Sequence, residues 1–71
     1  MTLPTQSEAR AQLQRLADEA TAHGGPVETT VELAPGDANY WTLNKAAKDF
    51  GGKVRTVRNL RDRKITLIAK P

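Results

Sequence analysis

The side chains best suited to bind a partner are cations, which are concentrated in the C-terminal half of the chain. Residues 1–40 hold two basic and six acidic side chains, whereas residues 41–71 hold nine basic and two acidic ones. A surface with such an excess of positive charge can bind phosphates or an acidic protein face, although it can also serve only to keep a small domain soluble. The candidate contacts in this half are Arg55, Arg58, Arg61, Arg63, Lys64 and Lys70.

Few of the 71 residues are suited to catalysis or to metal binding. The chain has no cysteine, which excludes a thiolate nucleophile and a cysteine-ligated metal. Its one histidine, His23, cannot form a metal cluster alone. Glu28 and Glu32 fall on one face of a predicted strand, but the strand separates them by about 13 Å, which is too far to share a proton. We therefore expect no enzymatic activity and no cofactor or metal site.

The three aromatic residues, Tyr40, Trp41 and Phe50, must contribute to a small core. Neighbouring residues of a helix point about 100° apart, so Tyr40 and Trp41 cannot both be central to that core. We expect Tyr40 to pack inward and Trp41 to cover an edge of the core. The alternative for Trp41 is a role as the anchor for a partner, because aromatic residues dominate binding hot spots.

The first predicted element is a helix over residues 7–22. Apolar residues at helical spacing form one stripe along it, and Ser7 can act as its N-cap. The glycine pair at 24–25 can end the helix because glycine accepts the left-handed conformation. Residues 1–6 are then expected to form a flexible N-terminal tail.

A strand and a second helix are predicted next. Residues 27–33 alternate between apolar and polar side chains, as a half-buried strand does. Pro35 and Gly36 break that strand, and Asp37 can cap a helix that runs to about residue 50. Leu43 and Phe50 belong to the buried stripe of this helix.

The segment 53–70 admits two interpretations. One is a β-hairpin with strands over residues 53–60 and 64–70. The other is a helix-turn-helix or winged-helix-like fold, because Leu43–Leu60 resembles that DNA-binding motif, with Gly51 at the turn and Val57 among the buried positions of a recognition helix. Gly52 departs from the motif, in which an apolar residue usually follows the turn glycine.

An internal repeat favours the hairpin. A shift of 27 residues aligns residues 16–33 with 43–60, and seven of the 18 aligned pairs are identical. The alignment places residues 54–60 on residues 27–33, the segment with the clearest strand pattern. The repeat therefore predicts two helix-glycine-glycine-strand units followed by a last strand.

The hairpin also assigns side chains to faces. A two-residue turn at Asp62 and Arg63 would pair Leu60 with Ile65. This register places Arg58 on the face covered by the helices, where it either reaches out at an edge or indicates that the register is wrong by one residue. The open face of the sheet then carries the cations Arg55, Arg61, Lys64 and Lys70 around Val57 and Ile68.

These elements predict an α+β fold in a single domain over residues 1–71, a helix-strand-helix-strand-strand open-faced sandwich of two layers. Its three-stranded mixed sheet has the first two strands parallel, joined by a crossover through the second helix, and the third strand antiparallel. The element order is similar to the later part of Alba-like and TusA-like small domains. The Cys-Pro motif of TusA-like domains is absent, so this likeness does not imply sulfur transfer.

The sequence thus predicts a small basic, non-enzymatic protein that binds nucleic acid through phosphate contacts, with duplex DNA slightly favoured over RNA. The alternative is a protein-interaction module, a regulator or inhibitor that docks its basic sheet face or an edge strand on an acidic protein. No apolar run approaches the about 18 residues of a membrane span, and the N-terminus lacks the basic start of a secretory signal. We therefore expect a soluble, cytoplasmic protein with no membrane partner.

Overall fold

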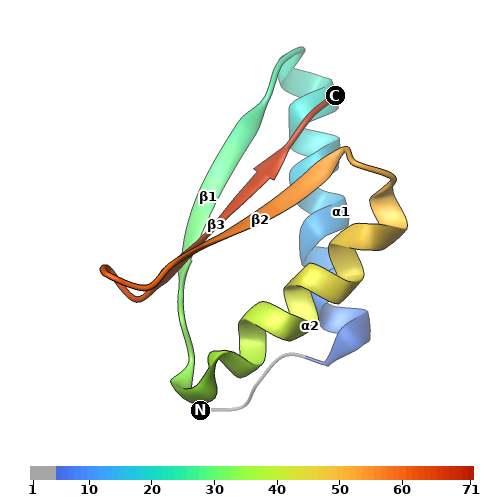
Figure 1. The fold of residues 1–71 in the computed structure, drawn as a ribbon. Helices are drawn as coiled ribbons and strands as arrows, with labels where there is room; N and C mark the ends of the chain where they lie inside the picture. The colour runs from blue at the N-terminus through green and yellow to red at the C-terminus, as the bar shows by residue number, and fades with distance from the viewer. Residues whose placement is uncertain (1–4) are drawn as a thin grey trace.

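Two amphipathic helices and three strands form in the order that the sequence predicts. The structure is a computed structural model that describes residues 5–71, and its elements are α1 (Gln6–His23), β1 (Val27–Glu32), α2 (Ala38–Ala47), β2 (Val54–Asn59) and β3 (Lys64–Ala69). Both helices lie on one side of the sheet and leave the other side open (Figure 1). The α+β, two-layer prediction is confirmed. The helix-turn-helix alternative is wrong, because the segment that would be its recognition helix is strand β2.

The start of α1 differs from the prediction because a better cap lies upstream of Ser7. The Thr5 hydroxyl accepts a hydrogen bond from the Glu8 backbone N–H, and the Glu8 carboxylate accepts one from the Thr5 backbone N–H, each at 3.2 Å. This reciprocal pair is a capping box, which satisfies two backbone donors that a helix start leaves free. Residues 5 and 6 are therefore not part of a tail, and residues 1–4 lie outside the described part of the chain.

The sheet is antiparallel throughout, so the predicted mixed sheet is wrong. Its strand order is β1-β3-β2, and β3 pairs antiparallel with both neighbours. Strands β1 and β2 run in the same direction but are separated by β3. The physical reason is burial: β3 is the most apolar strand, with Ile65, Leu67 and Ala69 fully buried, and a central position shields both of its edges from water.

The 27-residue repeat matches the register of the sheet. Val27 of β1 and Val54 of β2 both pair with Ala69, and Glu32 and Asn59 both pair with Lys64. Every intervening pair follows the same rule, so residues related by the repeat meet the same residue of β3 from opposite sides. The prediction that residues 54–60 match residues 27–33 in structure is confirmed, apart from the last residue of each segment.

The hairpin between β2 and β3 has a longer turn than predicted. Residues 60–63 form the turn, and Arg58 pairs with Ile65, so the register differs by two residues from that of a two-residue turn. The Asn59 side chain accepts a hydrogen bond from the Asp62 backbone N–H at 3.1 Å, so the turn begins directly after Asn59. Of the turn residues, only Arg63 has a positive φ. Because the shift is even, the residues that remain in β2 and β3 keep their predicted faces. Leu60 and Arg61, predicted to belong to the sheet, lie in the turn instead, and Leu60 is exposed.

The core lies between the helices and the covered face of the sheet. The helices contribute fully buried Leu13 and Leu43, and β3 contributes fully buried Ile65 and Leu67. Partly buried Tyr40 and Phe50 pack against this cluster, whereas Trp41 is 55% exposed. Tyr40 therefore packs inward and Trp41 outward, as their spacing predicts.

Candidate nucleic-acid interface

The six predicted contact residues do not form one patch. Lys64 begins β3 and Lys70 follows its last residue, so about 20 Å of strand separates them. Arg61 and Arg63 lie in the β2–β3 turn, which extends away from the helical layer (Figure 1). The cations therefore divide into a group at the turn and a group at the opposite end of the hairpin, near Arg55.

Cations near the turn are partly neutralised by carboxylates. Arg58 Nη1 lies 2.6 Å from Asp37 Oδ2, and Arg63 Nη1 lies 3.7 Å from Asp37 Oδ1. Lys64 Nζ lies 3.4 Å from Glu32 Oε1 on the neighbouring strand β1. Arg61 is exposed and has no ion pair with any residue of 5–71. Three of the six predicted contacts thus have an internal partner that would compete with an external phosphate.

Arg58 lies on the covered face, where it reaches out at the edge of the sheet. Its guanidinium carbon is 4.7 Å from the centre of the Tyr40 ring and 5.3 Å from that of Trp41. Asp37 was expected to cap α2, but its side chain makes no capping bond and binds Arg58 instead, and its backbone is left-handed at φ 58°. The ion pair and the ring contacts fasten the start of α2 to strand β2.

Asp37→Asn should lower the free energy of unfolding by about 1–2 kcal/mol, because it removes the negative charge that pairs with Arg58 in a partly buried site. Asparagine tolerates the left-handed backbone, so the change isolates the charge. The measurement is a urea unfolding curve followed by circular dichroism.

Glu32→Gln is the matched control for that prediction. It neutralises the carboxylate of the Lys64–Glu32 pair, whose side chains are 48% and 79% exposed. An exposed pair contributes about 0–1 kcal/mol, so this variant should unfold close to the parent. Equal destabilisation by the two variants would show that Asp37 does not fasten α2 to the sheet.

At the other end of the hairpin, cations lie together on the open face. The Lys70 backbone N–H donates to the Lys53 carbonyl at 2.8 Å, which extends the ladder by one pair beyond β2 and β3. Lys53 therefore lies opposite Lys70, and Arg55 occupies the next position of the same face. Sequence reasoning missed Lys53 because its place opposite Lys70 depends on a register that only the turn decides.

A shallow groove between α2 and the free edge of β2 extends this group. Asn44, Lys48, Arg55 and Thr56 are among its lining residues, and the Thr56 hydroxyl donates to Asn44 Oδ1 at 3.0 Å across it. Lys45 follows Asn44 on the exposed side of the helix. We call the resulting surface the basic band, and its members are Lys45, Lys48, Lys53, Arg55 and Lys70.

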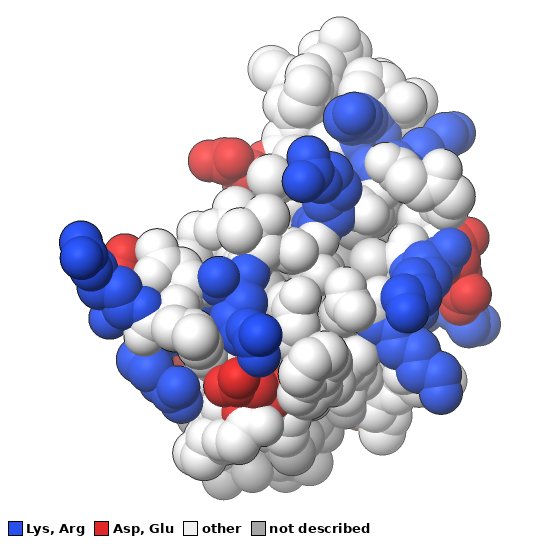
Figure 2. Space-filling model, viewed as in Figure 1, with Lys and Arg blue, Asp and Glu red and all other residues white. Residues whose placement is uncertain are grey.

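All five residues of the basic band are exposed, and none has a carboxylate partner within residues 5–71. Figure 2, viewed with α2 and β2 toward the reader, shows Lys and Arg side chains around a pale uncharged area, with few acidic side chains between them. Within residues 5–71 five unpaired cations therefore lie around α2, the start of β2 and the end of β3, whereas the unpaired Arg15 and Arg61 lie on α1 and in the turn.

The open face of the sheet is not basic throughout. Glu28 and Glu32 of β1 point to the same side as Ile68 and Lys64 of β3, because they pair with them. Since β1 and β2 lie at opposite edges, these glutamates are two strands away from Arg55. The arrangement confines the positive surface to the β2 edge and makes the β1 edge acidic.

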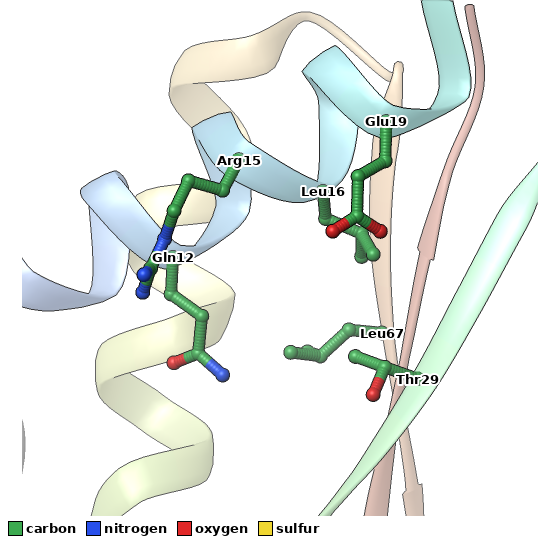
Figure 3. Close-up of a pocket in the computed structure, with 6 residues that line it drawn as sticks. All are labelled: Gln12, Arg15, Leu16, Glu19, Thr29 and Leu67. Atoms are coloured by element: carbon green, nitrogen blue, oxygen red, sulfur yellow. The ribbon is translucent and has the colours of Figure 1, made fainter. Parts of the chain in front are cut away.

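A second hollow lies between α1 and β1, on the covered side of the sheet. Figure 3 shows Leu16 and Leu67 at its base, with the Glu19 carboxylate directed into the space and Gln12 and Arg15 at one side. Thr29 of β1 is exposed and lines this hollow. Strand β1 is less buried than the repeat-related strand β2.

Within residues 5–71 no cluster of His, Cys, Asp or Glu side chains could hold a metal ion. None of the helices in that range is both long and apolar enough to cross a membrane. Comparison with protein-family models, with curated proteins and with solved structures gave no match to this chain. The likeness to Alba-like and TusA-like domains therefore remains one of element order, and the functional argument rests on the geometry of the basic band.

Proposed function

We propose that this protein is a small non-enzymatic nucleic-acid-binding protein that contacts duplex DNA through the phosphates. The observation that carries the proposal is the basic band, whose five exposed cations have no carboxylate partner among residues 5–71. Such cations displace the counterions condensed on DNA, and the release of those ions favours binding irrespective of sequence. A cytoplasmic location belongs to the same proposal.

The physical distinction between the band and the turn group supports this assignment. A cation that already binds a carboxylate must break that contact before it can bind a phosphate, whereas Lys53, Arg55 and Lys70 need not. The cross-strand position of Lys53 and Lys70 also holds two like charges side by side, an arrangement that costs stability in the free protein. An anion that binds between them removes this repulsion.

A second candidate function is a protein-interaction module, a regulator or inhibitor that docks on an acidic partner. Strand β2 pairs only with β3, so its outer backbone groups lie at a free edge of the sheet. An extended acidic peptide could add to this edge as a further strand, with Lys48 and Arg55 beside it in the groove. This candidate uses backbone pairing, which depends little on salt.

The two functions predict different salt dependence, and the test is the affinity of the parent protein for a mixed-sequence duplex of about 20 base pairs at increasing salt. Each phosphate contact contributes about −0.9 to the slope of log affinity against log salt, so the five cations predict a slope of about −4.5. Fluorescence anisotropy of a labelled duplex gives this slope. Absence of DNA and RNA binding at low salt would reject the proposal, and salt-tolerant binding to one acidic protein would favour the second candidate.

A further inference from the structure

Trp41 is held in a defined place although more than half of its surface is in solvent. It is 55% exposed, yet its ring meets the Tyr40 ring edge-on, with 5.1 Å between the ring centres. The guanidinium carbon of Arg58 lies 5.3 Å from the centre of the Trp41 ring. Arg58 is in turn fixed by Asp37 at 2.6 Å. A large apolar ring that is both exposed and positioned by neighbours has little conformational entropy left to lose when it binds.

The exposed indole continues the basic band along α2. Trp41, Lys45 and Lys48 are spaced by four and three residues, which places them on one side of the helical segment. The rise of a helix puts Lys45 about 6 Å and Lys48 about 10 Å along the axis from Trp41. A nucleic acid whose phosphates follow the band would therefore bring a nucleotide close to the indole.

Resting on the proposed function, we infer that Trp41 stacks on an unpaired nucleobase, so that the preferred ligand is a duplex with a single-stranded extension. The bases of an intact duplex are stacked on one another, and their faces are not available to a side chain. An extension supplies a free base, and an aromatic ring binds any base because each has a flat π face. Val57 and Leu60, the other large exposed apolar residues, lack aromatic rings and cannot serve this role.

Trp41 is the only tryptophan in the chain, so its fluorescence reports on the site directly. The parent protein is titrated at one salt concentration with a blunt duplex and with the same duplex carrying a short thymine overhang. We expect the overhang to bind tighter by about fivefold or more, the lower limit for one base on an aromatic ring, and to quench the fluorescence more strongly than the blunt duplex.

Trp41→Ala should abolish the preference for the overhang and leave the affinity for the blunt duplex unchanged, as measured with a labelled DNA. Trp41→Phe keeps a smaller ring and should retain part of the preference, and thermal unfolding of both variants confirms that they are folded. Lys45→Gln provides the opposite control, because it should lower the affinity for both duplexes by the same factor. The ratio of the two affinities should therefore not change.

The outcomes separate this inference from the proposed function. Equal binding of the two duplexes, with the blunt duplex still bound, would overturn base stacking while the phosphate interface stands. Failure to bind either duplex at low salt would reject both. Quenching by an acidic protein, without a response to the overhang, would show that Trp41 is a protein anchor and would overturn the inference.

Discussion

Leu67→Ala should leave the protein largely unfolded at room temperature. Leu67 is fully buried in the central strand and belongs to the core between both helices and the sheet. Truncation of a buried leucine costs about 2–5 kcal/mol, from lost apolar burial and from the cavity that remains. The total stability of so small a domain is only about 5 kcal/mol. Circular dichroism should show loss of helix and strand signal, with no cooperative melt comparable to that of the parent.

Leu60→Ala is the matched control because it makes the same chemical change in the same hairpin. Leu60 lies in the β2–β3 turn and is 58% exposed, so its truncation removes few contacts and should change stability by about 0.5 kcal/mol or less. A folded Leu67→Ala protein with a melting temperature near that of the parent would contradict the central position of β3. A Leu60→Ala protein that unfolds would restore the register in which Leu60 belongs to the sheet.

Removal of three charges from the basic band should cause the largest loss of DNA affinity. The variant combines Lys53→Gln, Arg55→Gln and Lys70→Gln, which lie next to one another on the open face. Loss of three phosphate contacts should flatten the slope of log affinity against log salt by about 2.7. Because the two lines converge near ~1 M salt, binding at ~50 mM salt should weaken by roughly a thousandfold or more. All three positions are exposed, so the melting temperature should not fall, and loss of the repulsion between Lys53 and Lys70 should raise it slightly.

The control for the band is a second triple variant with the same change in net charge. It combines Arg61→Gln, Arg63→Gln and Lys64→Gln at the turn, where Arg63 and Lys64 already have carboxylate partners. We expect its salt slope to differ from that of the parent by less than about one. Equal losses in the two triple variants would contradict the division into two groups and favour one extended patch, as the sequence predicts.

The two groups of cations illustrate why net charge alone does not define an interface. The chain has a formal charge of +3, and sequence reasoning assigned contacts to six of the nine cations in its basic half. The fold brings Asp37 and Glu32, from the acidic half, beside Arg58, Arg63 and Lys64. In the described part of the chain, the cations without an ion-pair partner include Lys45, Lys48 and Lys53, which sequence reasoning did not name as contacts.

Local structure could be predicted because short-range physics determines it. The alternation of residues 27–33 and the 27-residue repeat were sufficient to predict β1 and β2, and the glycines at 24 and 51 end helical segments in the left-handed conformation. The predicted face was also correct for each residue of the strands, including Arg58 on the covered face. Side chains alternate between the two faces of a strand, so a register shift by an even number of residues leaves each side chain on the same face.

Only the tertiary structure decided that β1 pairs with β3 and where the charges meet. Periodicity shows that a strand has a buried face, but it does not say which of its two edges has a neighbour. In the structure β3 lies between β1 and β2, a position that shields both of its edges while its apolar side chains are buried against the helices. The register of β2 and β3 depends on a side-chain hydrogen bond at Asn59, and that register places Lys53 opposite Lys70. Which cations form the basic band therefore depends on contacts between residues that are far apart in the sequence. No local sequence pattern predicts those contacts.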